Sequence, residues 1–334
     1  MKKNLLINHT IDYGNITLEK NLKSLFGKKF FYYSFNKLDE KKKNIQKKNI
    51  YKFLLSLQLR KIFRFYDFNK IVFNSLGPAI WTYGSYDFSK TILFIDWIDT
   101  LETFFLKKRI KFTLKFKLQK KILNEFPFIL CRTVILKNHL IKTYKINSNK
   151  LILMEAPFIF NKFDQKPKKV KAKPNVLFIG NDFKRKGGEL LMNNFEKLQK
   201  ICNLTLVTNH NTVKNLKIIK YVRYGSKTHL KLFKNNDIFI LPSIFDPYGM
   251  VIPEAMSSSL AVITSKNVLG ASNYIKNNKN GIICDNPNAT ISKLYSLLKN
   301  KNKINLLKKN AYQTMKKKHN VGIIKNNLLK ILNV

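Results

Sequence analysis

The chain alternates short apolar runs with stretches of helical periodicity, and this alternation limits the folds open to it. Several runs, such as IFIL at Ile238–Leu241, are continuously apolar, which is typical of strands buried on both faces of a parallel sheet. Strands separated by helical patterns indicate βαβ units and an α/β protein. Strands are predicted near Leu5–Ile7, Phe30–Phe35, Ile71–Asn74, Ile92–Ile95, Val134–Leu136 and Leu151–Met154, and then near Val176–Ile179, Leu204–Thr208, Ile218–Val222, Ile238–Leu241, Val262–Thr264 and Ile282–Cys284.

A basic segment divides the chain near its middle. At 334 residues the chain is long enough for two domains of ordinary size. Asn161–Pro174 (NKFDQKPKKVKAKP) has two prolines and no apolar periodicity, so it is predicted to be a linker. The sequence therefore predicts two Rossmann-like doubly wound domains, over residues 1–165 and 166–315, and a last helix over 316–334 that packs back on the first domain.

The net charge of +44 is spread along the whole chain. Residues 1–165 carry 32 Lys and Arg against 12 Asp and Glu, and residues 166–334 carry 31 against 7. A dedicated polyanion-binding tail would concentrate charge at one end, so biased composition accounts for most of it. A chain this basic is still expected to adhere to anionic surfaces at low salt.

Cysteine usage and hydropathy indicate a cytoplasmic protein. Cys131, Cys202 and Cys284 are far apart, and such an odd, sparse set suggests buried thiols in a reducing compartment. The start, MKKNLLINH, has too short an apolar run for a signal peptide. No stretch approaches the roughly 20 apolar residues of a transmembrane helix, so any membrane contact is expected to be peripheral.

The segment Phe104–Phe126 (FFLKKRIKFTLKFKLQKKILNEF) is rich in both phenylalanine and lysine. Read as one helix, it places Phe105, Phe112, Phe116 and Leu123 along one face. Two interpretations stay open: a packed domain helix with a solvated basic flank, or an interfacial helix that touches anionic lipid at the inner face of the membrane.

Two stretches of the second half carry the chemistry. In the first, a strand ends at Gly180, and a short loop with Arg185 and Lys186 leads into a helix, which suits a phosphate group. In the second, a strand ends at Pro242, and a loop with Asp246 and Gly249 leads into a helix that carries Glu254. The first-turn N–H groups of that helix can hold a diphosphate, because they have no partners within the helix.

These stretches resemble the motifs of a known family. Asp246–Glu254 resembles the E-x7-E signature of retaining glycosyltransferases of family 4, whose GT-B fold has two Rossmann-like domains facing a cleft. Gly180–Gly188 is similar to the G-x-D-F-x-R-K-G phosphate loop of the members that build the lipopolysaccharide core. The resemblance covers roughly the second half of the chain, and the first half matches in general layout only.

The resemblance implies a role for each matching residue. Arg185 and Lys186 would bind the donor diphosphate, Asp246 would bind hydroxyls of the transferred sugar, and Glu254 would bind the ribose hydroxyls. Asp96, Arg185, Lys186 and Asp246 form the implied catalytic set. Backbone at Tyr248, Gly249, Met250 and Val251 would face the sugar and phosphates, with Gly14, Gly180 and Asn181 completing the nucleotide-sugar site.

Three departures from the family pattern stand out. Asp246 replaces a glutamate, and Asn181 stands where many members have arginine. Many members also carry a histidine after an N-terminal strand, where this chain has Asp96 in IDWID; His9 is a second candidate for that role. Contacts to the base are expected near Tyr221–Gly225.

The resemblance implies transfer of a sugar from a nucleoside-diphosphate-sugar to a hydroxyl of a glycan or glycolipid, with retention. No D-x-D motif occurs, so a metal-independent reaction with no cofactor beyond the donor is expected. A nucleotide-sugar epimerase on the same fold stays open. So does a polyanion-binding protein that uses the positive charge for nucleic acid, although this alternative explains neither loop and we expect no specific nucleic acid partner.

Overall fold

The computed structural model describes residues 3–9, 13–35, 45–159, 163–210, 217–220, 222–318 and 321–332. The chain divides into two compact units. The first comprises Met1–Pro157 with Ile324–Val334, and the second comprises Phe158–Ile323, so the division falls a few residues before the predicted boundary at 165/166.

The first unit is built on a six-stranded sheet in the order β2-β1-β3-β4-β5-β6. All neighbouring strands pair in parallel, and the order reverses between β1 and β3. The strands are β1 (Lys3–His9), β2 (Phe30–Phe35), β3 (Phe68–Phe73), β4 (Thr91–Ile95), β5 (Phe128–Cys131) and β6 (Leu151–Leu153).

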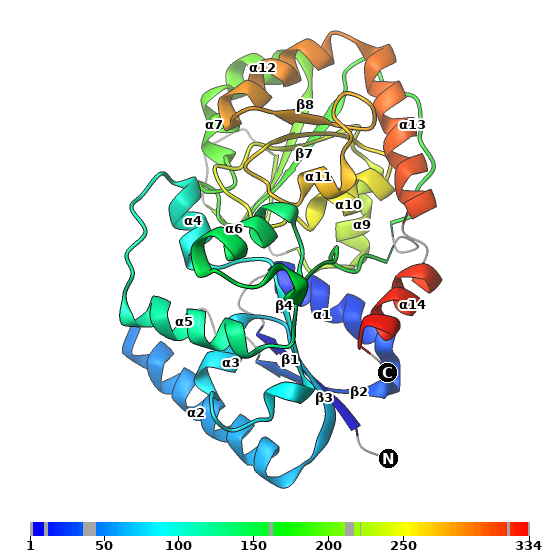
Figure 1. Ribbon diagram of the computed structural model, residues 1–334. Coiled ribbons are helices and arrows are strands. Elements are labelled where there is room, and N and C mark those ends of the chain that lie inside the picture. The colour runs from blue at the N-terminus through cyan, green and yellow to red at the C-terminus, as the bar shows by residue number, and fades with distance from the viewer. Residues whose placement is uncertain are drawn as a thin grey trace. The chain divides into compact units, whose positions relative to one another are not determined.

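Helices cover both faces of this sheet, as the doubly wound prediction requires. Figure 1 shows α1 and α14 on one side of the sheet and α2, α3 and α5 on the other. The helices are α1 (Tyr13–Phe26), α2 (Ile45–Phe65), α3 (Leu76–Trp81), α4 (Asp99–Phe105), α5 (Leu114–Glu125), α6 (Val134–Tyr144) and α14 (Val321–Leu332), with short 3₁₀ turns η1 (Gly27–Lys29), η2 (Phe88–Lys90) and η3 (Ser148–Lys150).

The second unit has a six-stranded parallel sheet in the order β12-β11-β10-β7-β8-β9. Counted from β7 as the first strand, this is the 3-2-1-4-5-6 order of a dinucleotide-binding sheet, and it reverses between β7 and β10. The strands are β7 (Asn175–Ile179), β8 (Asn203–Val207), β9 (Lys217–Ile219), β10 (Ile238–Leu241), β11 (Ala261–Ser265) and β12 (Ile282–Cys284).

Helices also flank this second sheet on both faces. In Figure 1, α7 lies beside α12, and α10 lies beside α13. The helices are α7 (Gly188–Asn193), α8 (Phe195–Ile201), α9 (Lys227–Lys234), α10 (Val251–Ser257), α11 (Ala271–Tyr274), α12 (Pro287–Leu298) and α13 (Lys301–Lys318). In the parts of the chain that the structure describes, no helix is both long and apolar enough to span a membrane.

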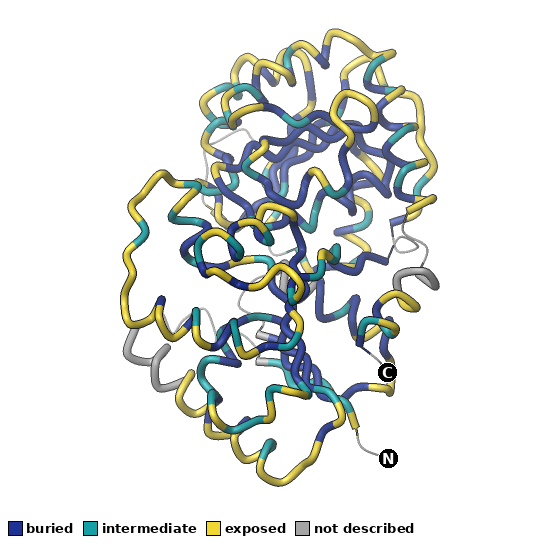
Figure 2. The backbone as a smooth tube through the Cα atoms, in the orientation of Figure 1, coloured by how far each residue is buried: buried dark blue, intermediate teal, exposed yellow. Residues whose placement is uncertain are grey.

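The central strands are buried on both faces, which confirms the interpretation of their continuous apolar runs. Every residue of β4, β10 and β11 is buried, and these strands form part of the dark layers in Figure 2. The three cysteines are free and buried, as predicted. Burial raises the pKa of the Cys131 thiol to about 12, so this thiol stays protonated and packs as an apolar group.

The strand predicted at Val134–Leu136 is wrong. The apolar run before it, Phe128–Cys131, forms β5, and Val134 begins α6. Thr133 explains the switch, because its side chain accepts a hydrogen bond from the Leu136 N–H at 3.1 Å and caps the helix.

The single helix predicted over Phe104–Phe126 is also wrong. It is two helices, α4 and α5, separated by residues 106–113. Lys107 ends the first in a left-handed conformation (φ 55°), and the Thr113 side chain caps the second by accepting from the Phe116 N–H. Phe105 and Phe112 therefore do not share a helix face, while Phe116 is buried and stacks on Tyr144.

Residues 166–169 and 171–173 of the predicted linker are exposed, but its start is packed against the second unit. Residues 160–162 lie outside the described chain, but Phe163 is fully buried in the second unit. Its carbonyl accepts from the Ser258 hydroxyl at 3.2 Å, and the Asp164 carboxylate accepts from the Tyr312 hydroxyl at 2.8 Å. The buried ring of Phe163 thus attaches the start of this basic segment to the second unit, although the composition of the segment predicts solvent exposure throughout.

Candidate active site

The strand order of the second unit determines where its ligand site should lie. Doubly wound sheets bind ligands beyond the carboxyl ends of the strands, at the point where the strand order reverses. Here that point lies between β7 and β10. Two segments begin there: the phosphate loop (Gly180–Gly187) after β7 and the acidic loop (Pro242–Met250) after β10.

The phosphate loop is a compact turn that requires glycine at its end. The Lys186 N–H donates to the Asp182 carbonyl at 2.9 Å, and the Gly187 N–H donates to the Lys184 carbonyl at 3.0 Å. Gly187 has φ 81°, in the left-handed region that favours glycine. A Cβ at Gly187 would also overlap the carbonyl oxygen of Pro242, so the phosphate loop packs directly on the acidic loop.

Asp246 organises the acidic loop. Its Oδ1 accepts hydrogen bonds from the Tyr248 N–H at 3.3 Å and the Gly249 N–H at 3.1 Å. Its backbone forms an isolated parallel β-bridge with Val268. Gly249 has φ 76°, and a Cβ there would press on the Val268 side chain. This close approach keeps the turn before α10 tight.

Three contacts join the two loops. The Ile244 N–H donates to the Arg185 carbonyl at 2.9 Å, and Arg185 Nη1 donates to the Phe245 carbonyl at 2.8 Å. The Lys186 ammonium forms an ion pair with Oδ2 of Asp246. The structure thus brings together Arg185, Lys186 and Asp246, as the resemblance implies.

Asp246 is held in its charged form despite being buried. Burial alone would raise the pKa of this carboxyl, but the charge and hydrogen bond of Lys186, aided by Arg185 and the Tyr248 N–H, hold the pKa below its usual range. At neutral pH, therefore, the Asp246 carboxylate lies beside two cations, of which Arg185 also donates through Nε to the Asp182 carboxylate at 2.7 Å.

Glu254 lies in the first turn of α10, and its environment is different. The carboxyl is buried, and that burial raises its pKa well above the usual range. Nε2 of His229 on α9 lies 3.6 Å from Oε2 of Glu254. The site thus contains one carboxylate paired with lysine and a second that faces an imidazole.

The other predicted residues of this site follow the two loops. Tyr248 is buried and its hydroxyl lies 2.7 Å from that of Tyr274, so its backbone rather than its ring faces Asp246. A Cβ at Gly180 would crowd the Lys186 side chain, and Asn181 is exposed on the loop. Met250 and Val251 are partly exposed where α10 begins. Tyr221 lies outside the described residues.

The remaining candidates belong to the first unit. Gly14 is the second residue of α1, not part of a described loop, and residues 10–12 before this helix lie outside the described chain. His9 ends β1, but its side chain is also outside the described part. Asp96 directly follows β4 and accepts a hydrogen bond from Arg132 Nη1 at 2.8 Å.

Arg132 connects Asp96 to a buried polar network that the motifs did not indicate. Its Nη2 donates to Asn74, and Asn74 donates in turn to Asn8. Asn8 then donates to Glu19 of α1 at 2.8 Å. Their position relative to the strands could have revealed these residues. Asn8 comes directly after the apolar residues of β1, and Asn74 and Arg132 directly follow β3 and β5. All three therefore lie at the carboxyl edge of one sheet.

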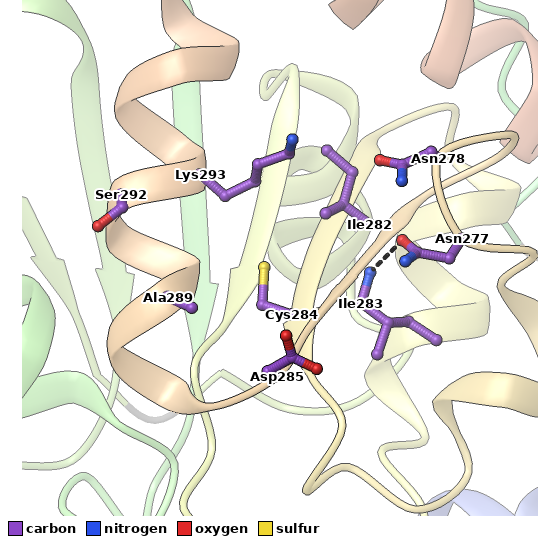
Figure 3. A pocket seen from close by; sticks show the side chains of 9 residues that line it. All are labelled: Asn277, Asn278, Ile282, Ile283, Cys284, Asp285, Ala289, Ser292 and Lys293. Atoms are coloured by element: carbon purple, nitrogen blue, oxygen red, sulfur yellow. Dashed lines mark hydrogen bonds between the residues drawn. The ribbon is translucent and has the colours of Figure 1, made fainter.

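A surface hollow of about 470 Å³ lies elsewhere in the second unit. Figure 3 shows it between β12, at the edge of the sheet, and α12, with the Ile283 N–H donating to the Asn277 side chain at 2.9 Å. It contains no residue of the phosphate or acidic loops and lies two strands away from β10. Its lining is formed by Asn277, Asn278, Ile282, Ile283, Cys284, Asp285, Ala289, Ser292 and Lys293.

Comparison with known proteins agrees with this geometry. Residues 159–314 match the family model described as glycosyl transferases group 1. A segment of 120 residues is 29% identical to an uncharacterized glycosyltransferase of Methanocaldococcus jannaschii, covering 32% of this chain and 30% of that protein. The match therefore spans less than a third of that relative's length.

Solved structures match over nearly the whole chain. HepE of Anabaena, in complex with UDP-glucose, is 14% identical with a TM-score of 0.77, and the match covers 100% of both chains. WaaG, a glycosyltransferase involved in lipopolysaccharide biosynthesis, is 14% identical with a TM-score of 0.71, covering 98% of this chain and 99% of WaaG. At this identity the likeness shows the fold. This is the two-domain GT-B fold that the resemblance implies, and the matched domain of glycosyl transferases group 1 contains both the phosphate loop and the acidic loop.

Proposed function

We propose that the protein transfers a sugar with retention from a nucleoside-diphosphate-sugar to a hydroxyl of a glycan or glycolipid acceptor, as a member of glycosyltransferase family 4. The observation that carries the proposal is the junction of the phosphate and acidic loops, where Lys186 pairs with Asp246 and Arg185 bonds across to Phe245. Two cations and a charged carboxylate at the strand-order reversal suit a diphosphate joined to a polyhydroxylated ring.

Each group has a defined task in this reaction. As the glycosidic bond breaks, negative charge grows on the departing diphosphate, and Lys186 and Arg185 stabilise it electrostatically. Asp246 exchanges part of its contact with Lys186 for the hydroxyls of the donor sugar. The acceptor hydroxyl gives its proton to the donor phosphate on the same face, so the chain needs no nucleophile of its own.

We propose UDP-sugars as the first donors to test, because HepE, which shares this fold, was solved with UDP-glucose. The test is a thermal-shift screen of the full chain against UDP-, GDP- and ADP-sugars, since a ligand that binds the native state raises the melting temperature by mass action. A shift with one base and not with the others identifies the donor class. The absence of any shift at millimolar concentrations contradicts the proposal.

Retention and the acceptor class are tested on the product. Polysaccharide and lipopolysaccharide-type acceptors are incubated with the donor, and the anomeric configuration of the new linkage is read by NMR. An inverted product contradicts retention. Conversion of the donor to an isomeric sugar nucleotide without any acceptor would instead favour the epimerase.

Substitutions of the two carboxylates should separate binding from turnover. Glu254→Gln is expected to weaken nucleotide affinity by about 1.5–3 kcal/mol, because the ribose hydroxyls lose a charged acceptor. Asp246→Asn should weaken nucleotide affinity less and lower kcat more, because its contacts are with the transferred sugar. Calorimetry and steady-state kinetics check both. Equal, small effects of the two changes on both quantities contradict the assigned roles.

We propose that the reaction needs no metal, since the sequence has no D-x-D motif. Within the residues that the structure describes, no three His, Cys, Asp or Glu side chains form a metal-binding group. Turnover in excess EDTA, compared with turnover in added Mg²⁺ or Mn²⁺, is the direct assay.

We further propose peripheral binding to an anionic membrane at the cytoplasmic face, through the α4–α5 face, defined here as Phe104, Leu106, Phe112, Leu114 and Leu118. These apolar side chains are exposed, with Phe112 at 68% and Leu114 at 83%. Exposed Lys107, Lys108, Arg109 and Lys111 lie among them in sequence. Apolar side chains interspersed with cations suit the interface of an anionic bilayer.

The membrane proposal predicts salt-sensitive, reversible binding to phosphatidylglycerol vesicles in a sedimentation assay. Changing Phe104, Phe112 and Leu114 together to serine should weaken that binding at least about tenfold, because each change removes exposed apolar area that would enter the lipid. Phe65→Ser on α2, which is also highly exposed, is the matched control and should bind as the parent does. Equal losses in the triple variant and the control would contradict the assignment of this face.

A further inference from the structure

His229 is held in a fixed position opposite Glu254. It is the third residue of α9, and its backbone N–H donates to the Ser226 hydroxyl that caps the helix, at 3.1 Å. Its Nε2 lies 3.6 Å from Oε2 of Glu254, and both side chains are less than a tenth exposed. Nothing in the phosphate or acidic loop motifs indicated a histidine at this place.

The backbone of the preceding turn determines which nitrogen of the imidazole carries the proton. The Gly225 N–H donates to Nδ1 of His229 at 3.4 Å. A ring nitrogen that accepts a hydrogen bond cannot carry the proton of a neutral imidazole, so the proton resides on Nε2. The Nε2–H group is the one that faces Glu254.

Aromatic side chains surround the imidazole of His229. The rings of Phe163, Tyr224 and Phe233 lie with their centroids 5.8, 5.4 and 5.2 Å from that of His229. An apolar surrounding strengthens a polar contact inside it and makes an unpaired carboxylate costly. Burial raises the pKa of the Glu254 carboxyl, and an N–H aimed at that carboxyl acts in the opposite direction by favouring the ionised form, which accepts hydroxyl hydrogen bonds through both oxygens.

The separation of 3.6 Å is slightly longer than a hydrogen bond. Contacts of this kind in active sites commonly tighten when the ligand arrives. A ribose diol that draws one carboxylate oxygen of Glu254 would leave the other facing His229.

We propose that His229 is a positioning residue for ribose recognition, holding one oxygen of Glu254 through Nε2–H so that the other accepts from the ribose hydroxyls. The inference rests on the proposed function, which assigns the ribose to Glu254. It adds a residue on α9, outside both loop motifs, that contributes to recognition of the nucleoside.

The experiment compares UDP with 2′,3′-dideoxy-UDP by calorimetry on the full chain, or the corresponding pair for whichever base the donor screen selects. His229→Leu is expected to weaken UDP binding about tenfold and to leave dideoxy-UDP binding unchanged, because only UDP presents the ribose diol. His229→Gln, whose amide N–H reaches toward the position of Nε2, should recover most of the loss. In steady state, His229→Leu should raise the donor KM with little change in kcat.

His139→Leu is the matched control for removing a buried histidine. His139 lies in the first unit, where its Nε2 is 2.9 Å from the Thr100 hydroxyl. Its loss should lower the melting temperature without changing the preference for UDP over dideoxy-UDP. Equal weakening of both nucleotides by His229→Leu, no change in either, or a folded His229→Gln that recovers nothing overturns the inference. A parent protein that binds no nucleotide contradicts the proposed function itself.

Discussion

Replacing Lys186 with alanine is expected to lower turnover by roughly a hundredfold or more. The ammonium lies where the phosphate loop meets the acidic loop, beside Asp246 and one residue from Arg185. In the proposed reaction, charge grows on the leaving diphosphate, so a contact from Lys186 would strengthen in the transition state. Removing a single donor of this kind typically costs about a hundredfold or more in kcat. Single-turnover kinetics at saturating donor measures the loss directly.

Two further variants separate chemistry from folding. Lys184→Ala changes an exposed lysine two residues away and should keep near-normal turnover. Lys186→Ala leaves Asp246 buried without its ion-pair partner, so its melting temperature should fall. Lys186→Gln can still donate to Asp246 and should fold better while remaining slow. If Lys184→Ala and Lys186→Ala lose activity equally, or if Lys186→Gln turns over like the parent, the phosphate-loop assignment fails.

Replacing Lys308 with methionine is expected to lower the free energy of unfolding of the second unit by about 3–5 kcal/mol. Lys308 Nζ lies 2.6 Å from Oδ1 of Asp237, and both side chains are buried. Asp237 precedes β10, and its other carboxylate oxygen accepts from the Asn175 N–H at 3.1 Å. Methionine fills the space of lysine but leaves a buried carboxylate with no cation. Urea unfolding, followed by a probe in the second unit, measures the change.

Lys309→Met is the control, because Lys309 is the next residue on α13 and is exposed. Its effect should stay within about 0.5 kcal/mol. Adding Asp237→Asn to Lys308→Met removes the stranded charge and should restore part of the stability. Similar behaviour of the Lys308 and Lys309 variants would show that the pair contributes little.

The sequence predicted those parts of the fold where the local signal and the tertiary environment agree. Ile238–Leu241 forms β10 with the predicted bounds, because a run buried on both faces has no polar residue within it and ends at a proline. The strand predicted at Val134–Leu136 failed because two apolar runs are adjacent there, and only the capping geometry of Thr133 decides between them. The prediction of one helix over Phe104–Phe126 failed because the spacing of its apolar residues stays helical across Lys107, where the backbone makes a left-handed turn.

The residues of the candidate site were likewise predicted only in part. The sequence placed Lys186 and Asp246 in one site through the resemblance of their two motifs, and the structure brings them together because their loops follow neighbouring strands. His229 and Arg132 belong to neither motif. Arg132 could have been noticed only from its place after a buried strand, because its partners Asp96 and Asn74 follow other strands of the same sheet. The role of His229 depends on its distance from Glu254 on another helix, and no local sequence pattern records that distance.

The interlocking of the phosphate and acidic loops has a consequence for exchanging parts between relatives. Gly187 fits against the carbonyl of Pro242, and the backbone of Arg185 bonds to that of Ile244. A chimera that takes its phosphate loop from one enzyme and its acidic loop from another would have to match both contacts at once. Residues 180–187 and 242–250 should therefore be transplanted together when donor preference is redesigned, and substitutions in the two loops should be inherited as a pair as the protein diverges.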